Sequence, residues 1–228
     1  MNHPVKKEAR PRGRPRKFDE GDALDAALRT FWAKGYDGTT VDDLVEAMGI
    51  GRPSLYATFG DKDSLFFRCL ERYAETLGAE TLKAFLAPKG VHEAVRAFVR
   101  QGVLNATGSA TPPGCIMACV APAVADRRVR ARVAEAFEGA VQAISARLRE
   151  AVAEGVLPRE LPVAQRARAV VDASTALTVR ARLGATRSEL LADADAWANL
   201  LTGESGPAAP DPTTTRRGKK TARKGPPG

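Results

Sequence analysis

Two short helices joined by a tight turn are the strongest constraint that this sequence places on the fold, and residues 39–62 encode them. Thr40 is a capping residue whose hydroxyl can accept from a free amide of the first helical turn, and apolar residues follow it at helical spacing. Gly49 stands where a helix of this length needs a left-handed end. Pro53 falls in the first turn of a new helix, where proline is best tolerated. These signals predict a helix, a turn and a second short helix within one segment.

The second of these helices has the surface that a DNA-reading helix needs. Leu55 and Phe59, four residues apart, form a narrow apolar anchor, and the remaining face is polar and partly basic. A helix of this kind suits insertion into a DNA major groove. The guanidinium of Arg52 can pair with guanine there, and the phenol of Tyr56 can donate to a phosphate, which fixes register. The alternatives are a solvated surface arginine and a semi-buried core tyrosine.

The segment resembles the DNA-binding end of the TetR/AcrR family of bacterial transcriptional regulators. The resemblance extends from about Gly13 to Tyr73 and is carried by FWAKGYDGTT and by AMGIGRPSLYATFGDKDSLF. It implies an all-α fold, with an N-terminal three-helix helix-turn-helix DNA-binding domain followed by a larger helical ligand-binding and dimerisation domain. It also implies a homodimer on a palindromic operator in double-stranded DNA. The sequence departs from the commoner family pattern at Gly51 and Pro53, so base preference is not carried over.

The expected DNA contacts surround the second helix and the starts of its neighbours. Helix N-termini attract phosphate, and the resemblance likewise implies that Thr40 and Lys62 contact the DNA backbone. For Lys62 the alternative is a solvated lysine on a turn. The full set of DNA contacts predicted in this region is Thr39, Thr40, Gly51, Arg52, Ser54, Tyr56, Ala57, Thr58 and Lys62.

Positive charge is concentrated at the two ends of the 228-residue chain, whose net charge is +8. Residues 1–18 contain seven Lys and Arg against one Glu, and residues 203–228 contain six against two acidic residues. Basic tails on a nearly neutral core indicate a polyanionic partner. Nucleic acid fits better than membrane, because neither tail has the apolar face of an interfacial helix.

Within the first tail, Arg12 and Arg14 belong to the segment RGRPR, which resembles an AT-hook core. Such a segment can lie in a narrow A·T-rich minor groove, where the negative potential is strongest. We therefore expect Arg12 and Arg14 to contact DNA, with a disordered solubilising tail as the alternative. For the C-terminal RRGKKTARK run, a non-specific electrostatic role and no role are both open.

Several classes of protein are disfavoured by what the sequence lacks. No apolar run approaches the roughly 18 residues needed to span a bilayer, and no apolar stretch follows the basic N-terminus as in a secretory signal. We therefore expect a cytoplasmic protein without a membrane partner. Three cysteines make no disulfide framework, and His3 and His92 lie far from them, so we expect no metal. No nucleotide-binding fingerprint or nucleophile motif occurs, so we expect no cofactor and no enzymatic activity.

Helical periodicity with short breaks continues to the C-terminal tail. Beyond the short pair, we expect helices at about 22–34, 61–86, 91–106, 115–124, 127–154, 163–183 and 188–201. Pro122 is expected to kink or end the helix within 115–124. The expected domains are a disordered basic arm over residues 1–16, a TetR-type helix-turn-helix domain over 17–77, a helical effector-binding and dimerisation domain over 78–202, and a disordered basic tail over 203–228.

The last two expected helices carry apolar stripes with small residues, which suit a four-helix bundle between two subunits. The residues expected at this dimer interface are Val170, Ser174, Leu177, Leu190, Ala194 and Trp197. The residues expected in an effector pocket are Phe98, Cys115, Met117 and Phe137, with core packing as the alternative for each. Trp197 is a further candidate for the pocket.

These features predict a transcriptional repressor that an unknown small-molecule effector releases from its operator. One rival is an activator, or a regulator that responds to oxidants or electrophiles instead of a small ligand. The oxidant-responsive alternative is open because Cys115 and Cys119 lie one helical turn apart. The alternative for these cysteines is that they are two small buried hydrophobes. The second rival is an architectural DNA-binding protein that acts through its basic tails. The long helical core disfavours it, because DNA packaging alone does not need such a core.

Overall fold

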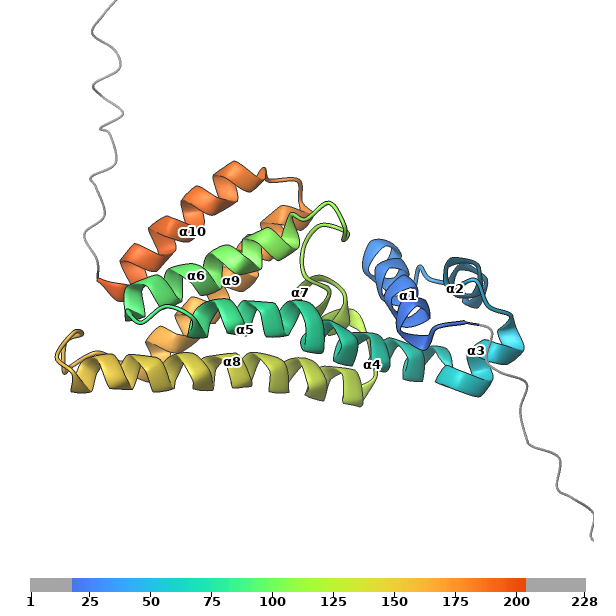
Figure 1. Cartoon of the computed structure of the whole chain (residues 1–228), viewed down its shortest axis with the longest axis horizontal. Helices are drawn as coiled ribbons and strands as arrows, with labels where there is room; N and C mark the ends of the chain where they lie inside the picture. Colours follow the sequence, from blue (N-terminus) through green and yellow to red (C-terminus); the bar gives the residue numbers. More distant parts are fainter. Residues whose placement is uncertain (1–17, 204–228) are drawn as a thin grey trace, which may run out of the picture.

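The computed structural model describes residues 18–203, and every regular element in that range is a helix (Figure 1). The all-α fold class predicted from the sequence is therefore confirmed. Arg12, Arg14 and the two basic tails lie outside the described residues. A small three-helix unit occupies one end of the molecule, and a larger helical bundle occupies the rest (Figure 1).

Local capping signals define the three-helix unit, which consists of α1 (Glu20–Lys34), α2 (Val41–Met48) and α3 (Arg52–Phe59). The Thr40 hydroxyl accepts from the Asp43 amide at 3.1 Å, and the Asp43 carboxylate accepts from the Thr40 amide at 2.8 Å. Gly49 ends α2 with a φ of 65°, a left-handed conformation that glycine adopts without a Cβ penalty. The first helix begins slightly before the expected residue, because Asp19 caps it.

A long connecting helix leads away from α3, as the sequence predicted, but it contains a π-helical segment. It consists of α4 (Lys62–Tyr73), the π segment η1 (Ala74–Gly78) and α5 (Ala79–Leu86). Asp61 caps its start by accepting from the Ser64 amide at 2.8 Å. A π segment inserts one residue into the helical register, and such insertions are frequent at functional sites. The periodicity of the sequence carried no signal for it.

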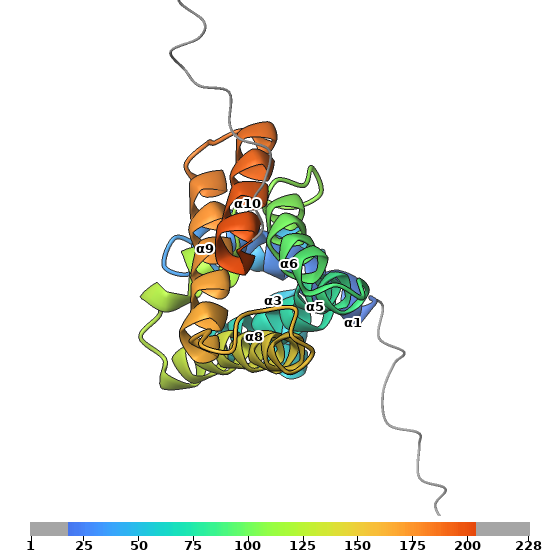
Figure 2. The same ribbon diagram turned by 90° about the vertical axis from the view of Figure 1, so that its left-hand side faces the viewer.

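The larger bundle consists of α6 (Val91–Ala106), α7 (Ile116–Cys119), the 3₁₀ turn η2 (Ala121–Ala123), α8 (Arg127–Ala153), α9 (Val163–Arg182) and α10 (Arg187–Thr202). The apolar segment 115–124 is interrupted near Pro122, as the sequence predicted, but the break comes earlier: α7 ends before Val120, and η2, which contains Pro122, follows. Viewed along the long axis, α5, α6, α8 and α9 surround the centre of the bundle (Figure 2).

Two apolar cores hold the molecule, and the first crosses from the three-helix unit into the rest of the chain. It joins buried residues of α1–α4 to Ile116 and Met117 of α7 and to Val129 and Val133 of α8. The second core lies among α5, α6, α8, α9 and α10. Because α7 and the start of α8 pack in one core with the three-helix unit, a movement of either one is transmitted to that unit directly.

The expected dimer stripe is wrong for most of its residues. Val170, Leu177, Leu190 and Ala194 belong to the second core, and Ser174 is buried as well. Only Trp197 is exposed, with 40% of its surface accessible. The stripe faces inward because α9 and α10 pack on α6 of the same chain, so its apolar side is already covered.

Candidate functional site

The outer face of α3 is accessible and its anchor is buried, as predicted. Leu55 and Phe59 are buried under the helix. Arg52, Ser54, Tyr56 and Ala57 are exposed, together with the N-cap Gly51, and Thr58 is partly exposed. Since 51% of the Tyr56 surface is accessible, its alternative as a semi-buried core residue is wrong. The face is therefore free to meet a partner.

An ion pair with α2 restrains the arginine of this face. Nη2 of Arg52 lies 2.5 Å from Oδ1 of Asp42 in α2, and both side chains are exposed. The hydrogen bond from Arg52 and the neighbouring charge raise the pKa of the guanidinium further above its usual value. Exposed pairs of this type contribute little stability, so the arginine can exchange the carboxylate for a base.

Thr39 does not lie on the exposed face, so the prediction that it contacts DNA is wrong. Its side chain is buried, and its hydroxyl donates to the Gly35 carbonyl at 2.6 Å. Thr40 is exposed at the start of α2, and its hydroxyl donates to the Asp43 carboxylate at 2.8 Å. A contact with phosphate requires the hydroxyl to leave this carboxylate. The Thr39 hydroxyl is drawn inward because it completes the turn that links α1 to α2.

Lys62 is held at the start of α4 by an aromatic residue that sequence reasoning missed. Its Nζ lies 4.3 Å from the centre of the Tyr36 ring, within range of a cation–π contact. The Tyr36 hydroxyl in turn donates to Asp63. Burial first, and then this hydrogen bond, raise the pKa of the Tyr36 phenol. The GYDG turn of the sequence contains Tyr36, but nothing local shows that the ring reaches α4.

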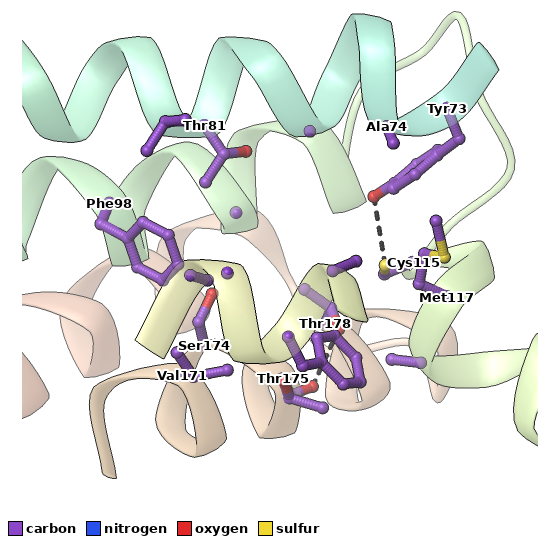
Figure 3. Close-up of a pocket in the computed structure, with 18 of the residues that line it drawn as sticks. Tyr73, Ala74, Thr81, Phe98, Cys115, Met117, Val171, Ser174, Thr175 and Thr178 are labelled. Atoms are coloured by element: carbon purple, nitrogen blue, oxygen red, sulfur yellow. Dashed lines mark hydrogen bonds between the residues drawn. The ribbon is translucent and has the colours of Figure 1, made fainter. Parts of the chain in front are cut away.

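A cavity of about 700 Å³ lies between the connecting helix and α6, α7, α8 and α9. All four residues that the sequence placed in an effector pocket line it, namely Phe98, Cys115, Met117 and Phe137. Figure 3 shows the first three of them on the cavity wall. The volume matches that of small-molecule sites in proteins. Trp197 lies on α10 and is not among the lining residues, so it is wrong as a pocket candidate.

Sequence reasoning missed most of the polar groups of this cavity. Hydroxyl and amide side chains line it from the connecting helix, α6, α8 and α9, namely those of Tyr73, Thr81, Asn105, Gln142, Ser174, Thr175 and Thr178. The Tyr73 hydroxyl donates to Cys115 Sγ at 3.1 Å (Figure 3). Burial raises the pKa of both the Tyr73 phenol and the Cys115 thiol, so each is uncharged at neutral pH. In the sequence, the only sign of these cavity residues is a polar side chain within an otherwise apolar helical stripe.

Arg182 joins α9 to the end of α1, another contact that the sequence did not reveal. Its guanidinium donates to the Trp32 carbonyl at 2.7 Å and to the Ala33 carbonyl at 3.3 Å. These carbonyls belong to the last turn of α1, where helix ends carry unsatisfied acceptors and partial negative charge. The pair links residues 150 positions apart in sequence.

Residues 18–203 contain neither a metal-binding cluster nor a helix that could cross a membrane. In this range no three His, Cys, Asp or Glu side chains are grouped closely enough to hold a metal ion. The helices described there are each too short or too polar to cross a membrane.

Comparison with known families identifies both parts of the chain. Residues 23–69 match the family described as bacterial regulatory proteins, tetR family. Residues 92–203 match the tetracyclin repressor-like C-terminal domain. The chain belongs to the TetR family. The resemblance noted in residues 13–73 is thereby confirmed and extended into the bundle.

Individual TetR-family relatives agree with this assignment. The HTH-type transcriptional repressor ComR of Escherichia coli is 40% identical over 107 residues, which is 46% of this chain and 51% of ComR. The match therefore spans about half the length of that relative. A putative TetR regulator from Rhodococcus is 35% identical, with 79% of this chain and 97% of that chain covered and a TM-score of 0.55. A cysteine mutant of CifR in complex with operator DNA is 29% identical, with 82% and 98% covered and a TM-score of 0.76.

Proposed function

We propose that this TetR-family protein is a non-enzymatic, cytoplasmic transcriptional repressor that binds a palindromic operator as a homodimer. One observation carries the proposal: the outer face of α3 is polar, basic and exposed, while its apolar anchors are buried. That arrangement is what a recognition helix needs to enter a major groove. The solved CifR complex, a structural neighbour, contains operator DNA, which supports the same partner here.

The proposed contacts divide into base readout and positioning. Arg52 and Ser54 open the recognition helix and face the bases, where arginine pairs with guanine. Tyr56, Thr40 and Lys62 contact phosphates, which orient the protein and carry no sequence information. Gly51, Ala57 and Thr58 allow close approach of the helix to the groove, and Arg12 and Arg14 extend the contact along the minor groove. Thr39 is withdrawn from the interface because it is buried.

The proposed dimer uses the outer side of the last two helices. Leu183, directly after α9, is 80% exposed, and Leu200 of α10 is 66% exposed. Val179 of α9 and Trp197 of α10 are exposed as well, as are the small residues Ala176 and Ala196. An apolar face with small residues permits close packing against a second copy. A two-fold pair of recognition helices would then match a palindrome.

A small molecule in the cavity is proposed to release the operator. The wall of the cavity includes Tyr73, Ala74 and Gly78 of the connecting helix. A ligand that prefers one position of this helix shifts the population towards dimers in which the recognition helices are wrongly spaced. The effector remains unidentified, and an activator or an oxidant-responsive regulator remains the rival.

Footprinting of the full chain on its own upstream DNA tests the proposal. We expect a discrete palindromic footprint that shows protection on one face of the duplex. The Arg52→Ala variant, tested beside it, should lose this protection at lower salt than wild type. Diffuse coverage of A·T-rich DNA would contradict the proposal and favour an architectural protein. Transcription that falls when the protein is removed would indicate an activator.

A further inference from the structure

Tyr73 touches both the cavity and the DNA-binding unit. It is the last residue of α4, directly before the π segment. Its ring lies edge-on to Trp32 of α1, with centres 5.4 Å apart and planes at 82°. Its hydroxyl points at the Cys115 sulfur on the cavity wall (Figure 3). The Tyr73 side chain therefore lies on the cavity wall through its hydroxyl and packs against α1 through its ring.

The junction around Trp32 is held by few polar contacts. Its indole nitrogen is buried and has no hydrogen-bond partner among the described residues. A buried donor without a partner is unfavourable, and no hydrogen bond of the indole fixes the position of the Trp32 ring. The main-chain carbonyl of Trp32 accepts from Arg182, which holds the helix end while the ring packs on Tyr73. Small displacements of the Tyr73 ring can therefore repack Trp32.

The cavity also restricts the chemistry of what enters it. Its inner polar groups are uncharged, and they include Ser174 and Thr178, both buried. The charged residues of the lining belong to α8, where Glu135 and Glu138 are exposed. Arg132 lies 3.8 Å from Glu135, which already opposes its charge. An anionic ligand would lose its hydration and meet only Arg132, whose charge Glu135 already opposes, which is costly. A cationic ligand would meet carboxylates only at exposed positions, where water screens the attraction.

We propose that the cavity takes an uncharged, mainly apolar molecule and that Tyr73 is the residue that transmits its presence to α1. A ligand that competes for the Tyr73 hydroxyl, or displaces Cys115 from it, moves the ring against Trp32. Because Trp32 and Tyr73 pack in one core with the three-helix unit, that movement reorients α1 and the helices packed on it. The ligand class and the movement of Tyr73 do not depend on the proposed repressor function. Only the expected result, the release of DNA, rests on it.

Trp32 itself provides the measurement. The chain has two tryptophans, and Trp197→Phe leaves Trp32 as the single fluorophore while it keeps an aromatic ring on α10. Three probes of matched size are added to this full-length protein: 4-butylbenzyl alcohol, 4-butylbenzoate and 4-butylbenzylamine. All three are transparent where tryptophan is excited selectively. We expect the alcohol to change Trp32 emission saturably and to bind at least tenfold more tightly than either charged probe.

Two single-hydroxyl variants separate transmission from binding. Tyr73→Phe keeps the ring on Trp32 and removes the hydroxyl, whereas Ser174→Ala removes a cavity hydroxyl that is remote from Trp32. Calorimetry should show that both bind the alcohol within about fivefold of each other, since each loses one hydrogen-bonding group. The Trp32 response at saturation should fall several-fold in Tyr73→Phe and remain in Ser174→Ala. Operator release by the alcohol should follow the same pattern.

Three outcomes would overturn the inference. The first is binding of a charged probe as tight as that of the alcohol. The second is no binding of the alcohol up to its solubility limit. The third is a Trp32 response at saturation that is the same in Tyr73→Phe and Ser174→Ala. Footprinting of the ligand-free protein reports on the repressor function separately, so failure of one proposal is distinguishable from failure of the other.

Discussion

At the scale of single residues, the proposed base contact of Arg52 requires its guanidinium to leave the ion pair with Asp42. Arg52→Ala should weaken binding to the operator by about 1–3 kcal/mol and relax specificity at one base pair. The measurement is competition binding on the operator and on its single-base variants. Asp42→Asn is the matched control: it releases Arg52 from its partner and should leave affinity equal or higher. An equal loss by Arg52→Ala on random DNA would contradict base contact.

The cysteines are the second prediction at this scale. Cys115 is held by Tyr73, and burial raises the pKa of its thiol, which reduces the thiolate available for oxidation. Replacement of Cys115 and Cys119 by Ser should therefore leave the response of operator binding to diamide or peroxide the same as in wild type. Serine at position 115 also keeps an acceptor for Tyr73. If wild type releases DNA after oxidation and the double variant does not, the protein responds to oxidants.

At the scale of elements, two glycines beside the cavity have opposite roles. Gly139 lies within α8, and a Cβ added there meets no other atom within 4 Å. Gly114 has a φ of 91°, and an added Cβ would lie 3.0 Å from Arg182 Cβ and 3.1 Å from Cys119 Sγ. Gly139→Ala should raise the free energy of unfolding by about 0.5–1 kcal/mol, because alanine is the better helix former. Gly114→Ala should lower it by about 1–3 kcal/mol through backbone strain.

Denaturant melts of the two glycine variants check this pair. Each replaces one hydrogen by one methyl group, so a difference in sign reports on the local structure alone. Equal changes in the free energy of unfolding would contradict the strained, closely packed position of Gly114 in the loop before α7. Because that loop also contacts Arg182, Gly114→Ala should in addition weaken the support of α1.

At the scale of the whole molecule, the dimer interface is proposed on the exposed side of α9 and α10. Leu200→Glu should weaken dimerisation at least tenfold, because the two-fold axis places each substituted carboxylate in an apolar interface. Sedimentation velocity measures the dissociation constant. Leu86→Glu on α5 is the matched control, since Leu86 is 59% exposed against 66% for Leu200. Equal effects of the two would show that the interface lies elsewhere.

The basic arm is the second prediction at the molecular scale. Residues 1–17 hold seven Lys and Arg against one Glu, and they lie outside the described residues. Deletion of the arm should make the dependence of log affinity on log salt shallower, because fewer counterions are released from DNA. Helical content, measured by circular dichroism, should remain. An unchanged slope on the operator would show that the arm does not contact DNA.

The sequence by itself determined the elements whose signals lie within a few residues. Thr40 and Asp43 form their capping box, Gly49 ends α2, and Asp61 starts α4. The burial of Leu55 beneath the recognition helix also followed from spacing alone. These features are local because helix ends are set by hydrogen bonds between neighbours in the chain.

Only the tertiary structure decided which surface each helix covers. An apolar stripe must be buried, but periodicity does not say whether the same chain or a second copy covers it. For Val170 and Leu190 the answer is α6 and the core of the same chain. Likewise, the contacts of Tyr73 with Trp32 and of Arg182 with the end of α1 join distant parts of the chain. Such pairings depend on how the elements pack, which no local pattern records.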